Sequence, residues 1–194
     1  GGAPIEPIRR FHAGFAAGAR AVDPDIRIRA RYLSRPPDFS GFNSYALAYQ
    51  AARQLYASGA DVVYHAAGYS GFGVVGAAHE LSEKRSAQLW AIGVDGDQYR
   101  EVETLDPAEF GIPNDAKRQV LTSMIKRVDR AVDAALDDYK RGRLRTGVLE
   151  LGLRAQGVEL ARSGGFIDDI QSEIDRYRRQ IADGTLHVPT VPGK

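Results

Sequence analysis

The sequence predicts an α/β protein with a parallel sheet flanked by helices. Residues 61–67 and 87–94 are short apolar runs rich in β-forming residues, as in strands that are buried on both faces. Between them lie a glycine-containing turn and a helical segment that runs to about residue 85, which completes a β-α-β unit. Ligands of such sheets bind at the carboxyl ends of the strands, so the residues that follow each strand are the first candidates for a site.

The segments before this unit alternate in the same way. Residues 7–22 carry apolar side chains at helical spacing, and Pro24 follows the predicted helix. Residues 26–33 alternate apolar residues with arginines, which predicts a strand near an edge of the sheet. A turn-forming loop at 34–41 then leads into a predicted helix at 42–58, with Gly59 as its C-cap.

The later segments are expected to be more varied. Residues 98–118 are polar and irregular, 119–123 fit a short strand and 125–139 fit an amphipathic helix. Residues 142–162 change to an apolar alternation of period two, which predicts a hairpin. A last helix is predicted at 166–182, before a short proline-rich tail.

Composition excludes several classes of function. The chain has 194 residues, a formal charge of +1 and no cysteine, which excludes disulfides, zinc–thiolate sites, iron–sulfur ligation and cysteine nucleophiles. Residues 1–124 carry 13 basic and 14 acidic side chains, and residues 125–194 carry 13 and 11. This balance gives no reason to expect binding to nucleic acid or to an anionic membrane surface.

Polar residues gather after three predicted strands. Residues 68–73 follow the first of them, Asp95 and Asp97 follow the second, and Lys126 follows the third. In a parallel sheet these groups share one edge. The glycine pattern G-x-x-G-x-G matches neither the dinucleotide fingerprint nor a P-loop. It fits either a tight strand-to-helix turn or a set of open backbone N–H groups that face a polar ligand.

Asp95 has several possible roles. The Asp95-Gly96-Asp97 sequence lacks the rest of a calcium-binding loop, and two carboxylates so close in one loop do not provide the separation that glycoside hydrolysis requires. A carboxylate at a strand end can instead accept hydrogen bonds from two vicinal hydroxyls of a sugar. We favour that role, with a helix-capping or surface role as the alternative.

The other chemical signals are weaker. The histidines show no metal-type spacing such as H-x-x-x-H, and each is expected to be structural, although His65 stands at a strand end. No serine lies in a G-x-S-x-G elbow. Aromatic residues gather near two of the loops and either stack on a planar base or fill the core below: Phe39, Phe42, Tyr64, Tyr69 and Phe72.

Three segments in a fixed order resemble a known family: HAAG at residues 65–68, IGVDGDQ at 92–98 and LTSMIK at 121–126. They are similar to the basic membrane protein family of ABC-transporter substrate-binding lipoproteins, which includes bacterial purine nucleoside receptors. Further matches cover nearly the whole chain: FHAGFAAG at 11–18, GADVV at 59–63, LGL at 151–153 and DGTLHVP at 183–189.

The resemblance implies a type I periplasmic-binding-protein-like fold, in which two α/β lobes enclose the ligand. Members of the family are about twice as long as this chain, so the chain is expected to be a C-terminal portion. Residues 1–124 would form the second lobe, opened by a strand that ends at Gly1 and Gly2. Residues 125–194 would form a hinge-crossing helix, a hairpin and a C-terminal helix that belong largely to the first lobe.

The resemblance also implies the binding residues. Phe42 would stack on the base, and Gly68 would lie in the ligand-facing turn. Asp95 would bind the ribose hydroxyls, and Lys126 would add a polar contact near the hinge. Residues 35–41 look like an insertion, so Phe39 is an alternative stacking ring.

The expected function is therefore solute binding for an ABC importer, with a purine nucleoside as the solute and neither catalysis, cofactor nor metal. The expected partners are the permease subunits and the N-terminal lobe, and the expected location is the cell envelope, with lipid anchoring in the full-length protein. Two alternatives remain. One is a cytoplasmic nucleoside- or sugar-acting enzyme with Asp95 or Asp97 as general base. The other is a ligand-sensing regulator on the same fold.

Overall fold

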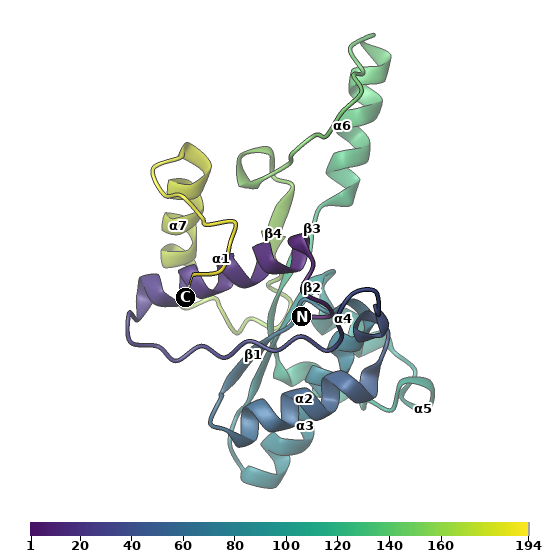
Figure 1. The fold of residues 1–194 in the computed structure, drawn as a ribbon, viewed down its shortest axis with the longest axis vertical. Helices are drawn as coiled ribbons and strands as arrows, with labels where there is room; N and C mark the ends of the chain where they lie inside the picture. The colour runs from purple at the N-terminus through teal and green to yellow at the C-terminus, as the bar shows by residue number, and fades with distance from the viewer. Residues whose placement is uncertain (194) are drawn as a thin grey trace.

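A four-stranded sheet lies at the centre of the computed structural model, which describes residues 1–193 (Figure 1). The strands follow one another in the sheet in the order in which they occur in the chain: β1 (Val62–Tyr64), β2 (Trp90–Asp95), β3 (Val120–Lys126) and β4 (Val158–Leu160). β1, β2 and β3 are parallel, whereas β4 is antiparallel to β3. The predicted parallel sheet is confirmed for the first three strands, and their carboxyl ends meet at one edge.

Helices surround this sheet. The α-helices are α1 (Glu6–Val22), α2 (Tyr45–Ala57), α3 (Gly71–Arg85), α4 (Gln98–Thr104), α5 (Pro107–Phe110), α6 (Val128–Lys140) and α7 (Gln171–Asp183). Short 3-10 turns precede or link several of them: η1 (Ser40–Phe42), η2 (Gly68–Ser70), η3 (Asn114–Gln119) and η4 (Leu153–Ala155). Among residues 1–193, no helix combines the length and the apolar character needed to cross a membrane.

Both faces of the parallel strands are covered. Val63 joins a core formed with α2 and α3, which lie side by side in Figure 1. On the opposite face, Tyr64 stacks on Phe15 of α1 with 5.2 Å between ring centres, and Trp90 lies 4.8 Å from Phe166. Because side chains alternate along a strand, neighbouring residues serve the two faces in turn, which explains why these strands are apolar throughout.

Gly73 sets the close approach of α2 and α3. A Cβ placed there would lie 2.3 Å from the Tyr45 carbonyl oxygen and 2.7 Å from the Tyr49 nitrogen. Both neighbours are backbone atoms of α2, so the helices would have to separate.

We expect Gly73→Ala to lower the free energy of unfolding by about 1–3 kcal/mol, as is usual for overpacking a tight core. Gly18 is the matched control, since it lies in α1 and a Cβ added there would have nothing within 4 Å. Gly18→Ala should stabilise the chain by about 0.5–1 kcal/mol through the loss of chain entropy in the unfolded state. Urea unfolding of both variants checks the pair, and equal effects would contradict this packing.

The predicted strand at residues 26–33 is wrong. The segment is irregular, and its end bonds to the first residues of the chain: Gly1 donates to the Arg31 carbonyl oxygen, and Leu33 and Ser34 donate to the carbonyl oxygens of Gly1 and Gly2. A hollow of about 570 Å³ is lined by residues 26–33 and by β1. The alternating sequence therefore has no neighbouring strand along most of its length, and a strand requires one.

The predicted hairpin at residues 142–162 is also wrong. Only β4 forms, and its partner is β3, with Met124 opposite Leu160 and Lys126 opposite Val158. Residues 142–152 contain no strand. The alternation in the sequence predicts that the segment can join a sheet, but it does not predict which strand it pairs with.

Residues 98–118, predicted to be irregular, contain α4, α5 and η3. The side chains of Asp97 and Asp106 accept hydrogen bonds from the N–H groups of Arg100 and Ala108, and Pro107 occupies the first turn of α5. These are strong helix-start signals. The helices are short, so apolar periodicity does not reveal them.

α6 extends away from the rest of the molecule (Figure 1). None of its residues is buried, although it carries a row of apolar side chains that are at least half exposed: Val128, Val132, Leu136 and Tyr139. The predicted helices at 125–139 and 166–182 are confirmed with later starts, at Val128 and Gln171.

Candidate ligand-binding site

Asp95 and Lys126 meet at the carboxyl edge of the sheet. The Lys126 Nζ lies 2.6 Å from Asp95 Oδ1, and both side chains are about half exposed, at 47% and 50%. Lys126 also lies over the Phe11 ring, 5.2 Å from its centre. Parallel pairing of β2 with β3, which sets Asp95 opposite Ile125, brings these two residues together.

The backbone at Asp95 is unusual. Its φ angle is +75°, in the left-handed region that residues other than glycine rarely adopt, although Asp and Asn tolerate it best. Such conformations are found preferentially at functional sites. Gly96 follows, and a Cβ there would lie 2.0 Å from Glu101 Oε1, so a larger residue would displace the Glu101 side chain. Burial, and then the charges of Asp97 and Asp95, raise the pKa of Glu101.

Phe42 and Gly68 lie at the same edge. The Phe42 ring packs on Gly2, where a Cβ would lie 2.4 Å from ring carbons, and Gly2 donates to the carbonyl of Ala66 just after β1. A Cβ at Gly68 would lie 3.4 Å from the Phe42 carbonyl oxygen. Gly68 has a φ of +54°, which suits glycine and starts the turn before α3.

The other predicted aromatic residues divide into two groups. Phe39 is 52% exposed, next to η1. Tyr69, Phe72 and Phe110 of α5 pack against one another at centre distances of 5.9–6.3 Å, and Tyr64 stacks on Phe15. Tyr64, Tyr69 and Phe72 therefore have packing roles, although Tyr69 is 40% exposed. The Phe42 ring lies at the edge that residues 1–2 and 66–68 form, and Phe39 is the exposed ring three residues before it.

A buried polar network lies under this edge. His65 Nε2 and Gln98 Oε1 are 2.7 Å apart, and the Gln98 backbone N–H donates to Ser123 Oγ at 3.2 Å. Because Gln98 offers its carbonyl oxygen, Nε2 carries the proton of His65. The network joins the residue after β1 and the middle of β3 to the start of α4, so it positions the loop that carries Asp95.

Burial lowers the pKa of His65 to about 4, and the hydrogen bond to Gln98 only partly opposes this shift. His65 is therefore neutral near pH 7. Its Nδ1 has no hydrogen-bond partner among residues 1–193. A Cβ at Gly71 would lie 1.9 Å from the ring, so α3 begins directly against it.

Helix capping was the alternative role considered for Asp95, and in the structure it belongs to Asp97. Its side chain caps α4, and it also accepts a hydrogen bond from the Ser163 hydroxyl. Asp95 accepts no hydrogen bond from backbone within the described residues. The two carboxylates of this loop thus differ, and Asp95 is the one whose oxygens face outward.

The sequence predicts Asp95, Lys126, Gly68 and Phe42 as site residues, and the structure places Asp95 against Lys126 and Phe42 against Gly68. The sequence gives no separate indication of Gln98, Ser123 or Phe11. Gln98 follows an apolar strand and Ser123 lies within one, and a polar residue at a buried position is a signal for such a network. Phe11 matches the apolar stripe of α1 and gives no separate signal. The arrangement provides acceptors, one cation and exposed rings, which suit binding of a polar solute with an aromatic part.

Comparison with known proteins agrees with this description. The family model for the ABC transporter substrate-binding protein PnrA-like family (Bmp) matches residues 1–191. The chain is 37% identical over 99% of its length to a CD4+ T-cell-stimulating antigen of Listeria innocua. It is 32% identical over 98% of its length to the ABC transporter nucleoside-binding protein BmpA of Lactococcus lactis. It covers 52% of each of these relatives, so it spans about half of their length.

Solved structures show the same fold. An ABC transporter solute-binding protein from Aeropyrum pernix superposes with a TM-score of 0.71 at 24% identity, over 96% of this chain and 55% of that one. A solute-binding protein from Conexibacter woesei gives 0.65 at 20% identity, over 96% and 54%. The predicted fold class is confirmed. With the match of the family model over nearly all of its length, the chain belongs to the PnrA-like (Bmp) family of ABC-transporter substrate-binding proteins.

Proposed function

We propose that this chain supplies part of a solute receptor for an ABC importer, and that the full-length protein binds a purine nucleoside between two lobes. The observation that supports this most is the Asp95–Lys126 ion pair at the carboxyl edge of the sheet. The relative from Lactococcus lactis carries nucleoside binding in its name, which makes a nucleoside the first solute to test.

Asp95 would bind the sugar. A carboxylate has two oxygens and can accept from both vicinal hydroxyls of a ribose. Lys126, whose Nζ lies 2.6 Å from one of these oxygens, would hold the orientation of the carboxylate. Closure of a second lobe would remove water from these bonds and strengthen them.

An aromatic ring would bind the base. We assign this role to Phe42, because its backbone lies against Gly68, and keep Phe39 as the alternative because its ring is exposed. We expect alanine at the true stacking position to weaken binding by about 1–3 kcal/mol, the value of one base–aromatic stack. Comparing Phe42→Ala with Phe39→Ala by calorimetry decides between them, and unchanged affinity in both variants would contradict stacking by either ring.

The rest of the receptor would come from a second lobe. The chain spans about half of its relatives. We propose that residues 1–124 form one lobe and that residues 125–194 belong largely to the other, whose surface would cover the apolar row of α6. The strand that leads into Gly1 would lie in the hollow between residues 26–33 and β1, since Gly1 and Gly2 already bond to Leu33, Ser34 and Ala66.

The location and partners follow from the same proposal. The receptor would work at the cell envelope, on the periplasmic or extracellular side, held by a lipid anchor. It would deliver its solute to permease subunits. A transcriptional activator from Bacillus halodurans has a related fold, with a TM-score of 0.51, so fold by itself does not separate receptors from regulators.

Calorimetry on the full-length protein tests the proposal. A purine nucleoside should bind with one site per chain, and chromatography of the mixture should recover it intact. Release of free base would instead establish an enzyme. Nucleoside binding by a protein that is found in the cytoplasm would favour the regulator.

A further inference from the structure

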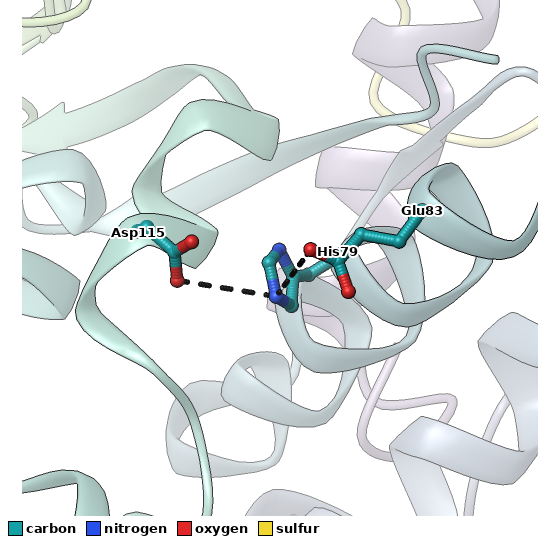
Figure 2. Close-up of side chains that lie close together, drawn as sticks. All are labelled: His79, Glu83 and Asp115. Carbon is teal, nitrogen blue, oxygen red and sulfur yellow. Dashed lines mark ion pairs between the residues drawn. The ribbon is translucent and has the colours of Figure 1, made fainter. Parts of the chain in front are cut away.

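A histidine and two carboxylates converge on one point far from the ligand edge (Figure 2). His79 and Glu83 lie one turn apart on α3, and Asp115 approaches them from η3. His79 Nε2 lies 3.8 Å from Glu83 Oε1 and 3.9 Å from Asp115 Oδ1. The three atoms lie within 4.8 Å of one another, so a single ion can contact all of them after small side-chain rotations.

A fourth residue orients the imidazole. Gln119 is buried, and its Oε1 lies 3.1 Å from His79 Nδ1. Since this oxygen is an acceptor, Nδ1 carries the proton and Nε2 directs a lone pair toward Glu83 and Asp115. Metal-binding histidines are oriented in this way, by a hydrogen bond from the ring nitrogen that does not bind the metal.

Among residues 1–193, the two carboxylates have no lysine or arginine at ion-pair distance, although Arg118 lines the hollow beside them. By contrast, Glu80 pairs with Lys84 on the same helix as Glu83. Two negative groups and a lone pair therefore face one another. A bound cation would stabilise the arrangement.

We propose that His79, Glu83 and Asp115 bind one Zn²⁺ ion. Zinc takes histidine nitrogen and carboxylate oxygen at about 2.0–2.2 Å, which places tetrahedral donors about 3.3–3.6 Å apart. The separations of 3.8 and 3.9 Å are only slightly longer, and the Glu83 and Asp115 side chains are 69% and 54% exposed and free to rotate. A hollow of about 390 Å³ beside them has room for a water as fourth ligand.

The imidazole decides which metal is bound. Calcium and magnesium prefer oxygen ligands alone, whereas imidazole nitrogen suits zinc and neighbouring transition metals. From the sequence alone, His79 is expected to be structural because no H-x-x-x-H pattern is present. The pattern here is H-x-x-x-E, and its third ligand comes from a different element.

This site is separate from the ligand edge. His79 lies eight residues after Gly71 on α3, which is about 12 Å along the helix axis. A bound ion would join η3 to α3 and stabilise their contact. The inference therefore does not depend on the proposed nucleoside binding.

Calorimetric titration of the chain with Zn²⁺ near neutral pH tests the site. We expect one ion per chain, a rise in melting temperature, and a shift of the His79 ring signals in NMR spectra. Glu83→Gln and Asp115→Asn should each weaken binding by about tenfold or more. Glu80→Gln is the matched control and should leave the affinity unchanged, because Glu80 pairs with Lys84 instead.

Several results would overturn the proposal. The first is that the folded chain does not bind Zn²⁺. The second is that the Glu83→Gln and Asp115→Asn variants bind Zn²⁺ as tightly as the parent chain does. The third is that the NMR signals of another histidine shift instead of those of His79. Calcium binding as tight as zinc binding would also contradict it. His79→Gln should abolish binding, but it alters a mostly buried side chain, so the two exposed carboxylate variants decide the outcome.

Discussion

Asp95→Asn is expected to weaken nucleoside binding by the full-length protein about 10- to 100-fold, which corresponds to roughly 1–3 kcal/mol. Asparagine has nearly the same size and tolerates the left-handed backbone at this position, where φ is +75°. It replaces one acceptor oxygen with an NH₂ donor, so one ribose hydroxyl loses its acceptor. It also removes the negative charge that faces Lys126, 2.6 Å away.

Asp97→Asn is the matched control for this variant. Asp97 lies two residues further along the same loop, where it caps α4, and asparagine is an equally good capping residue. Calorimetry should therefore give nearly normal affinity for Asp97→Asn. If the Asp95 and Asp97 variants bind equally well, or if Asp97→Asn is the weaker binder, Asp95 does not bind the sugar.

Acid should destabilise the chain through His65 by as much as about 3 kcal/mol. The ordinary histidine pKa of 6.5 falls to about 4 at this buried position, and each pKa unit corresponds to about 1.4 kcal/mol. Above pH 6.5, His65 is neutral in the folded and unfolded chains, so it has no effect on stability. As the pH falls from 6.5 to 4, the unfolded chain gains a proton that the folded chain does not, and the free energy of unfolding decreases.

The pH dependence of unfolding in urea measures this effect. Other groups also titrate in this range, so the comparison is between the parent chain and His65→Gln, which cannot gain the proton. The variant should have lower stability near pH 7 but a flatter decline between pH 6.5 and 4. His187→Gln, at an exposed position, should keep the slope of the parent chain. An unchanged slope in His65→Gln would show that His65 is not the buried titrating group.

Much of the fold could be predicted from the sequence because its central strands are buried on both faces. The runs that became β1 and β2 are apolar throughout, and the helices α1, α2 and α3 have clear apolar spacing or glycine boundaries. These signals are local. They fail where a strand needs a particular neighbour, as at residues 26–33, which lie beside a hollow, and at 142–152, where the expected hairpin partner does not form.

The residues of the candidate site that lie at strand ends could be predicted from the sequence. Asp95 and Lys126 each end a strand, so parallel pairing was enough to predict that they meet. The support beneath them was not predictable, because His65, Gln98 and Ser123 come from three elements and only their packing brings them together. The same reason hides the cluster at His79, whose third member comes from η3.

The most direct measurement is a crystal structure of the full-length protein with a purine nucleoside. We expect the Asp95 carboxylate to lie about 2.5–3.0 Å from both ribose hydroxyl oxygens, with the base stacked on the ring of Phe42 or Phe39. A nucleoside bound away from the carboxyl ends of β1, β2 and β3, or bound there with its ribose out of reach of Asp95, would contradict the proposed function.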